Sequence, residues 1–548
     1  MLIYSLIMLL LSNSLNRKKE KSILYSRILI LILFYSAVIL LNNCYLNTSI
    51  GFSIGLYYVS YITNIFHLII IILSFIIINL TSYYPTKIEN KITTYKPDIY
   101  NYNALCNTNK SLNSISKQFR IIEYPLIILF ILTGSLFLIS SSDLISIFLS
   151  IELQSYGLYI ISTIYRNSEL STSAGLTYFL LGGLSSCLIL LASSILYVNA
   201  GLTYLEGLYI ITDISDILVE NKFILHWYKP YYINISLVIL SVGFLFKISA
   251  APFHFWSPYV YDSIPTIITT FVAVISKVSI FILLLELVHF THKSFFITNY
   301  SWTITLLISC VLSLVIGTIG GLTQFRIKKL YAYSTISHIG FMLLALSVNT
   351  VESIQAFFFY LIQYSISNLN AFIILVAIGF SLSLSLDKNY KYMQEKNNSP
   401  IQYISQLKGY FYNNPFLSLS IIITFFSFVG VPPLVGFFGK QMVLSAALDK
   451  GYIFIVLLGV ITSVISAVYY LAVIKQIIFY KPDYSTSNKI KLTGYSLSNI
   501  NRIHNHIVLS CSLSITISIL TLIILLYILI PKEFLDITNI LSIIIFNY

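Results

Sequence analysis

Residues 232–256 read YINISLVILSVGFLFKISAAPFHFW, an almost wholly apolar stretch that holds one lysine, Lys247, and one proline, Pro252. About 20 such residues are enough for a helix to cross a hydrocarbon core of about 30 Å. Proline lacks a backbone N–H and its ring clashes with the preceding turn, so we expect this helix to break just beyond Lys247. Broken membrane helices free carbonyl groups that can bind water or a cation. The stretch therefore predicts a membrane span with a charge at its break.

The rest of the chain has the same apolar character. Hydrophobic residues make up 57% of the 548 residues and charged residues 9%, and the mean hydropathy is +0.86. Such a chain cannot cover itself with a soluble surface. We expect an all-α polytopic membrane protein with about 14 transmembrane helices. The expected spans are residues 2–13, 23–42, 56–82, 121–140, 143–165, 171–199, 232–256, 262–290, 301–322, 330–349, 353–385, 415–446, 452–480 and 506–531.

The net charge of +12 would suggest a nucleic-acid partner in a soluble protein. Its distribution favours another explanation, because about 22 of the 32 lysines and arginines lie in loops that follow odd-numbered spans and only about five in the other loops. Positively charged loops stay on the side from which a membrane protein inserts. The basic excess therefore sets the orientation of the chain, and we expect no nucleic acid.

Five basic residues lie inside the expected spans. Arg27 and Lys475 are close to span ends, where a long side chain can reach the headgroups. Lys247, Lys277 and Lys440 have deeper apolar flanks. A lysine at the centre of a membrane helix costs about 2.5 to 3.5 kcal/mol, so three cost roughly 10 kcal/mol, which is comparable with the net stability of a domain. These three lysines need compensation or a function.

The context of the three lysines points to proton exchange. Lys277 lies on the span that follows Lys247, so both are expected near mid-membrane on adjacent helices. A second proline break precedes Lys440, in VPPLVGFFGK (residues 431–440). Glu152 supplies the opposite charge from another span. A carboxylate beside a lysine keeps the lysine charged, and its departure lets the proton leave.

Other chemistry finds little support in the sequence. There is no nucleotide-binding fingerprint, and the glycines of Gly317–Gly321 read as close helix packing. His289 and His292 read as a surface pair rather than a metal site. The cysteines lack the spacing of zinc or iron–sulfur ligands, so we expect neither a metal nor a cofactor in this chain. They are Cys44, Cys106, Cys187, Cys310 and Cys511.

Several motifs together resemble the antiporter-like subunits of respiratory complex I. They are Lys-x-x-x-x-Pro-Phe-His-x-Trp at residues 247–256, Lys277, IEL around Glu152, GVPPLVGFFGK at residues 430–440 and LYAYSTISHIGF at residues 330–341. The last is similar to the LxAYSSISHxG segment of that family. The resemblance covers roughly residues 120–480 and rests on the combination of motifs.

Two positions distinguish this chain within the family. Where the family usually shows PDVYEGAPT, residues 258–266 read PYVYDSIPT, and Tyr259 replaces the acid. Lys440 stands where other members have a glutamate, which resembles one branch of the family in particular.

The resemblance implies two inverted five-helix repeats in which the broken spans seven and twelve are counterparts. It divides the chain into residues 1–120 with helices 1–3 and a basic loop, 121–290 as the first repeat, 301–481 as the second repeat, and 482–548 with helix 14 and the tail. It also implies that Glu152 pairs with Lys247, that Lys277 is the central relay and Lys440 the exit-side lysine, and that His254 and His338 are candidate relay residues.

The function implied is proton translocation by a subunit of NADH:ubiquinone reductase, coupled to electron transfer elsewhere. NADH, FMN, iron–sulfur clusters and ubiquinone are then expected on partner subunits, and the partners are other membrane-arm subunits and lipids such as cardiolipin. The 43 tyrosines against 22 glycines look like the codon bias of an AT-rich organelle genome, which suggests the mitochondrial inner membrane.

Two alternatives remain open from the sequence. One is an Mrp-type cation/proton antiporter subunit, which would share these motifs. The other is a structural role, in which the lysines only satisfy polar contacts between helices.

Overall fold

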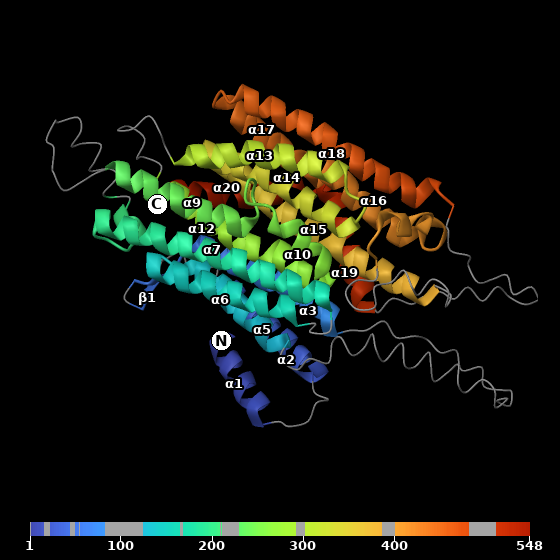
Figure 1. Cartoon of the computed structure of the whole chain (residues 1–548), viewed down its shortest axis with the longest axis horizontal. Helices are drawn as coiled ribbons and strands as arrows, with labels where there is room; N and C mark the ends of the chain where they lie inside the picture. The colour runs from blue at the N-terminus through green and yellow to red at the C-terminus, as the bar shows by residue number, and fades with distance from the viewer. Residues whose placement is uncertain are drawn as a thin grey trace, which may run out of the picture.

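The computed structural model describes residues 2–15, 22–43, 50–53, 55–82, 124–164, 168–208, 210, 230–291, 302–385, 401–481 and 511–547. Within these ranges the chain is a bundle of helices with one small hairpin, and most of the helices run side by side along the long axis of Figure 1, whereas α1 lies at a steep angle to it. The predicted all-α membrane class is confirmed.

The N-terminal part packs at one edge of the bundle, in blue in Figure 1. It consists of α1 (Leu2–Leu15), α2 (Ser22–Asn43), the strands β1 (Ile50–Phe52) and β2 (Tyr57–Val59), and α3 (Tyr61–Ser82). The two strands pair antiparallel with Gly51 opposite Tyr58.

The next part contains the first break. It consists of α5 (Tyr124–Ser140), α6 (Leu144–Thr163), α7 (Glu169–Ala200), α9 (Pro230–Ile248), α10 (Trp256–Ser263), α11 (Thr266–Thr270), the π-helical turn η2 (Phe271–Ile275) and α12 (Ser276–Thr291). Helix α9 ends at Ile248, one residue after Lys247, and the chain resumes helical structure only at Trp256. The predicted break beyond Lys247 is confirmed.

The following part contains the second break. It consists of α13 (Thr303–Leu322), α14 (Ile327–Val348), α15 (Val351–Ser385), the short helices η4 (Ile404–Leu407) and η5 (Tyr410–Tyr412), α16 (Pro415–Val429), α17 (Val435–Asp449) and α18 (Ile453–Phe479). Pro432 and Pro433 separate α16 from α17, as predicted. The C-terminal part is α19 (Cys511–Leu526), η6 (Tyr527–Leu529) and α20 (Pro531–Asn547).

Ten of the described helices are long and apolar enough to cross a membrane. Four shorter apolar helices, α1, α5, α9 and α16, fall on further expected spans. Helices α12, α14 and α15 are almost wholly buried, whereas α7 and α18 expose large apolar side chains such as Leu180 and Val464. Apolar side chains can face outward because lipid rather than water surrounds such a helix. The polar side chains discussed below are therefore held in the interior of the bundle.

Helices α13 and α14 approach each other closely at Gly317. A Cβ atom at this position would lie 2.6 Å from the backbone nitrogen of Ser337. Small residues permit this kind of close helix packing in membranes. The interpretation of this glycine as a packing residue is supported, and the contact fixes α14 relative to α13.

We expect Gly317→Ala to destabilise the protein by about 1 to 3 kcal/mol, because the new methyl group meets backbone that cannot move aside. Gly183→Ala is the matched control, since nothing lies within 4 Å of a Cβ atom there. Heat-induced loss of the assembled complex in detergent measures the difference. Equal stability of the two variants would contradict the close approach.

Candidate functional site

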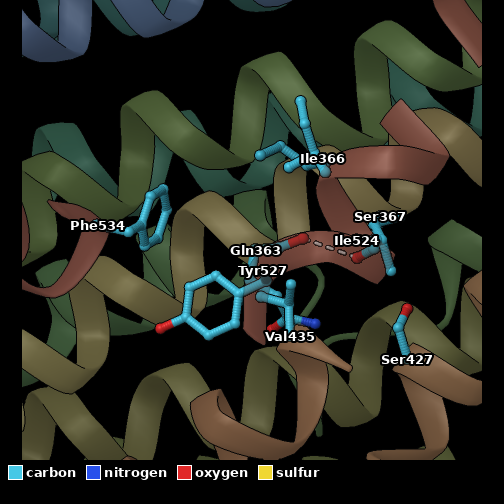
Figure 2. A pocket seen from close by; sticks show the side chains of 9 residues that line it. Gln363, Ile366, Ser367, Ser427, Val435, Ile524, Tyr527 and Phe534 are labelled. Atoms are coloured by element: carbon cyan, nitrogen blue, oxygen red, sulfur yellow. Dashed lines mark hydrogen bonds between the residues drawn. The ribbon is translucent and has the colours of Figure 1, made fainter. Parts of the chain in front are cut away.

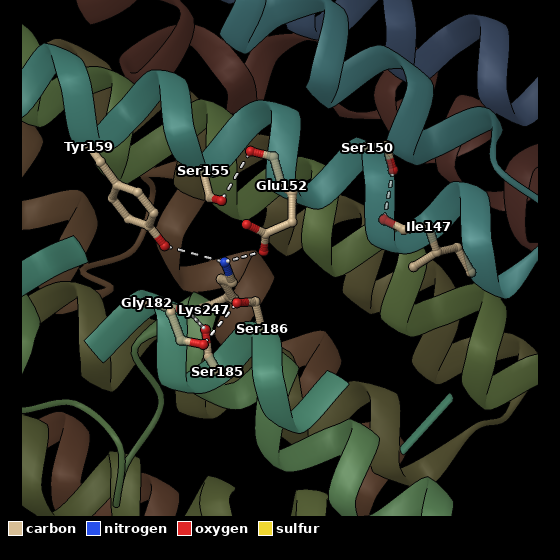
Figure 3. Close-up of polar contacts among 10 residues, drawn as sticks. Ile147, Ser150, Glu152, Ser155, Tyr159, Gly182, Ser185, Ser186 and Lys247 are labelled. Atoms are coloured by element: carbon tan, nitrogen blue, oxygen red, sulfur yellow. Dashed lines mark hydrogen bonds and ion pairs between the residues drawn. The ribbon is translucent and has the colours of Figure 1, made fainter. Parts of the chain in front are cut away.

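Lys247 and Glu152 form an ion pair between α9 and α6. The distance from Lys247 Nζ to Glu152 Oε1 is 3.6 Å, and the two side chains are 8% and 12% exposed. Figure 3 shows the ammonium group between this carboxylate and the hydroxyl of Tyr159, to which Lys247 donates a hydrogen bond of 3.4 Å. The lysine at the first break is therefore compensated by a full negative charge.

A glycine on α7 makes room for Tyr159. A Cβ atom at Gly182 would overlap the Tyr159 hydroxyl. The Tyr159 ring packs edge-on against Tyr178, which stacks on Trp256 with 4.7 Å between ring centroids. Trp256 in turn donates to the carbonyl of Phe246, next to Lys247. The aromatic residues thus connect the chain on both sides of the first break.

Lys277 lies near the start of α12 and is only 1% exposed. Its Nζ donates a hydrogen bond of 3.3 Å to the hydroxyl of Thr335 on α14 and lies 5.6 Å from the centre of the Tyr261 ring. Neither group carries a formal negative charge. Of the three predicted lysines, Lys277 has the weakest compensation for a positive charge.

Lys440 reaches from α17 to the end of α16. Its Nζ donates to the carbonyl oxygens of Phe428 and Val429 at 2.7 and 2.9 Å. These carbonyls belong to the last turn of α16 and have no partner further along that helix, because the chain breaks there. The C-terminal end of a helix also carries a partial negative charge that favours a cation. The second break thus makes the binding groups for its own lysine.

His338 lies between the surroundings of Lys277 and Lys440. It follows Thr335 by one helical turn on α14, and its Nδ1 shares a hydrogen bond of 2.7 Å with the Tyr360 hydroxyl. Its ring is 5.2 Å from that of Phe428, the residue whose carbonyl oxygen accepts a hydrogen bond from Lys440. Its Nε2 is buried and has no hydrogen-bond partner within the described ranges.

His254 is placed differently. It lies in the gap between α9 and α10 and is 6% exposed, and its ring packs against Phe255 and Tyr333. Among the contacts of the described residues, none joins His254 to the four predicted charged residues. The structure brings His338 into the polar interior more clearly than His254.

The structure adds polar residues that sequence reasoning did not select. Gln154 on α6 donates a hydrogen bond of 3.1 Å to Ser279 on α12, two residues beyond Lys277. This bond links the helix of Glu152 to the helix of Lys277. Glu286, a second carboxylate within a span, also lies on α12. A census of charges inside the spans would have found Glu286, but no local pattern predicts the bond of Gln154.

Lys328 corrects one part of the charge assignment. The sequence places it among the basic loop residues, but α14 begins at Ile327 and Lys328 is 1% exposed. Its Nζ donates to the carbonyl of Ile264 at 2.6 Å, where α10 has just ended. The expected span began at residue 330, and the contact with Ile264 is too distant in sequence for a local pattern to indicate it.

The motif at residues 258–266 also has a clear placement. Asp262 forms ion pairs with Arg326 at 2.6 Å and Lys329 at 3.8 Å. Tyr259, which stands in place of the acid usual in the family, is 40% exposed and shares a hydrogen bond of 3.0 Å with Ser173 on α7. Asp262, the acid of this motif that is present in the chain, thus binds the start of α14.

Two cavities border these groups. An open crevice of about 420 Å³ lies between α6 and α7 beside Tyr159. A smaller cavity of about 40 Å³ lies next to the second break (Figure 2). By volume it has room for at least one water molecule, and four of its lining residues have polar side chains. It is lined by Gln363, Ile366, Ser367, Ser427, Val435, Ile523, Ile524, Tyr527 and Phe534.

The fold and the buried lysines define an antiporter-like membrane subunit. A model of the family described as NADH:quinone oxidoreductase/Mrp antiporter, TM, matches residues 141–466. Over 559 aligned residues, and 100% of both chains, the protein is 43% identical to NADH-ubiquinone oxidoreductase chain 2 of Rhizopus oryzae. The chain therefore belongs to the family of NADH-ubiquinone oxidoreductase chain 2, and the recognition of a complex I subunit from its motifs is confirmed.

Solved structures share the fold. A chain of respiratory complex I from Thermus thermophilus superimposes with a TM-score of 0.68 over 98% of this chain and 97% of that chain, at 23% identity. A chain of the Mrp complex from Dietzia sp. gives a TM-score of 0.71 over 98% and 95% of the two chains, at 15% identity. At these identities the likeness concerns the fold alone.

We expect Glu152→Gln to destabilise the protein by about 3 to 5 kcal/mol, because it leaves the ammonium of Lys247 buried without its opposite charge. The double variant Glu152→Gln with Lys247→Met should recover most of this loss, since no unpaired charge remains. The thermal stability of the assembled complex measures both. A double variant no more stable than the single one would show that the pair is not the source of the effect.

Proposed function

We propose that this chain translocates protons across the membrane as a subunit of NADH:ubiquinone oxidoreductase, and that its buried lysines form the route. The observation that carries this proposal is the arrangement of Lys247, Lys277 and Lys440 in one helical interior, each bound to a different kind of partner. Hydrophobic helices could satisfy packing without these charges, and each central lysine costs about 2.5 to 3.5 kcal/mol on insertion scales. A function explains why the chain contains them.

The first step of the proposed route is a change in the pairing of Lys247. At 3.6 Å, the attraction between its ammonium and the Glu152 carboxylate amounts to about 5 kcal/mol at an effective dielectric constant of about 20. Withdrawing the carboxylate removes this attraction and favours transfer of the proton towards Lys277. Redox energy released in partner subunits would drive the withdrawal.

The second step leads from Lys277 to Lys440. Thr335 binds Lys277, and His338 lies one turn further along the same helix. Tyr360 binds His338. We assign His338 as the link to Lys440 and the Lys440 ammonium as the exit-side group. His254 is the weaker relay candidate because none of its described contacts joins it to Glu152, Lys247, Lys277 or Lys440. No described contact joins Lys247 directly to Lys277, so the route needs water between them.

The two breaks support a pair of related units. We propose that α5–α12 and α13–α18 are the two inverted repeats, corresponding to residues 121–290 and 301–481, with residues 1–120 and 482–548 flanking them. The interruption after α9 and the interruption after α16 are then counterparts. Discontinuous helices at matching places in two repeats commonly hold the transported ion.

The surroundings of the chain follow from its relatives. We propose that it lies in the mitochondrial inner membrane, beside other membrane-arm subunits and lipids such as cardiolipin. NADH, FMN, iron–sulfur clusters and ubiquinone would then be bound by partner subunits. The chain is 43% identical over its full length to an NADH-ubiquinone oxidoreductase chain, whereas it resembles the chain of the Mrp complex in fold alone. This difference favours the proposal over an Mrp-type antiporter.

We expect Lys277→Met to abolish most NADH-driven proton pumping while the complex still assembles. Methionine fills similar space without a proton-binding group, so the route is interrupted at its centre. Proton uptake by sealed membrane vesicles during NADH oxidation measures the effect. Lys450→Met is the matched control, because Lys450 is an exposed lysine just beyond α17.

Three outcomes distinguish the alternatives. Undiminished pumping by assembled Lys277→Met complex would exclude Lys277 as a relay. A series of lysine variants that changes assembly but never the number of protons per NADH would support a structural role. Sodium-dependent exchange without NADH oxidation would indicate an antiporter.

A further inference from the structure

The segment that leads into Lys277 is not a regular α-helix. The π-helical turn Phe271–Ile275 separates α11 from α12, and Lys277 is the second residue of α12. A π-helical turn adds a residue relative to an α-helix and is frequent at functional sites. Each residue of an α-helix advances by about 100° around the axis, so one extra residue decides the direction in which Lys277 points.

Tyr364 of α15 contacts this turn at its middle residue. Its hydroxyl donates a hydrogen bond of 3.2 Å to the carbonyl oxygen of Ala273. The same hydroxyl interacts with the side chain of Thr335, the group that accepts the hydrogen bond of Lys277. Tyr364 is 2% exposed, so these contacts are made away from solvent. One hydroxyl therefore touches both the turn before Lys277 and the partner of Lys277.

We propose that Tyr364 is a positioning residue for proton translocation, whose hydroxyl holds the π-helical turn in the register that presents Lys277 to Thr335. This inference rests on the proposed role of Lys277. In this proposal Tyr364 itself carries no proton. It affects transport only by fixing the position of the Lys277 ammonium.

The physical reason is that the turn needs outside support. π-Helical turns are rare, and a buried carbonyl that loses its donor is left with an uncompensated cost. Without the Tyr364 hydroxyl, the Ala273 carbonyl is satisfied best by an α-helical hydrogen bond. That change of register would rotate Lys277 away from Thr335. A phenylalanine at position 364 would keep the ring beside His338, which lies 6.1 Å away between centroids.

The test is Tyr364→Phe in the intact complex, measured as protons pumped per NADH oxidised over a range of pH. We expect the population in which Lys277 is bound to Thr335 to fall between about twofold and tenfold, the effect of one hydrogen bond, and we expect the pumping ratio to fall and its pH profile to be displaced. A density map of the variant should show the Lys277 ammonium moved from Thr335. The hydroxyl is the only group removed.

Tyr331→Phe is the matched control. Tyr331 on α14 is 1% exposed, and its buried hydroxyl has no hydrogen-bond partner among the residues that the structure describes. Its loss should change neither the pumping ratio nor the pH profile. A general effect of removing a buried hydroxyl would appear in both variants.

The outcomes separate this inference from the function on which it rests. If Lys277→Met stops pumping but Tyr364→Phe behaves like Tyr331→Phe, the positioning role is wrong and the function of Lys277 stands. A Tyr364→Phe complex that is less abundant but pumps with the normal ratio and pH profile also overturns the positioning role. If Lys277→Met pumps normally, the proposed function itself fails.

Discussion

The structure depends on how an apolar interior accommodates positive charge. Three lysines are held among buried helices, and each meets a different partner: a carboxylate for Lys247, a neutral hydroxyl for Lys277 and two helix-end carbonyls for Lys440. Intact helices offer few such groups, because their backbone is fully hydrogen-bonded in lipid. The break after α16 thus supplies the partners of Lys440, whereas Lys247 and Lys277 bind side chains of neighbouring helices.

The fold could be predicted largely from the sequence. Apolar runs fixed the expected spans, and prolines beside lysines marked both breaks, since these signals are local. The partners of the lysines could not be derived in the same way. Lys247 and Glu152 lie on helices that are far apart in the sequence, so only the family resemblance indicated that they form a pair. Lys328 was assigned to a loop because its contact with Ile264 comes from another part of the chain.

The contacts of Gln154 and Tyr364 are a second feature that could not be predicted from the sequence. Each is a polar residue in an apolar helix, which by itself fits packing or function equally well. Its meaning comes from the helix it meets: Ser279 near Lys277 in one case, and the π-helical turn before Lys277 in the other. Register changes such as this turn have no signature in apolar periodicity, because a uniformly buried helix is apolar on every side.

The two broken regions differ in a way that bears on direction. The partner of Lys247 is a side chain, which can leave by rotating about its own bonds. The partners of Lys440 are backbone carbonyls at the end of α16, which move only if the helix moves. In the proposed route, the adjustable electrostatic contact therefore lies at Lys247 and the rigid one at Lys440. A conformational signal from a partner subunit therefore needs to displace only one carboxylate to change the energy of a proton on the three lysines. Two repeats with matching breaks can in this way still form a route with a distinct beginning and end.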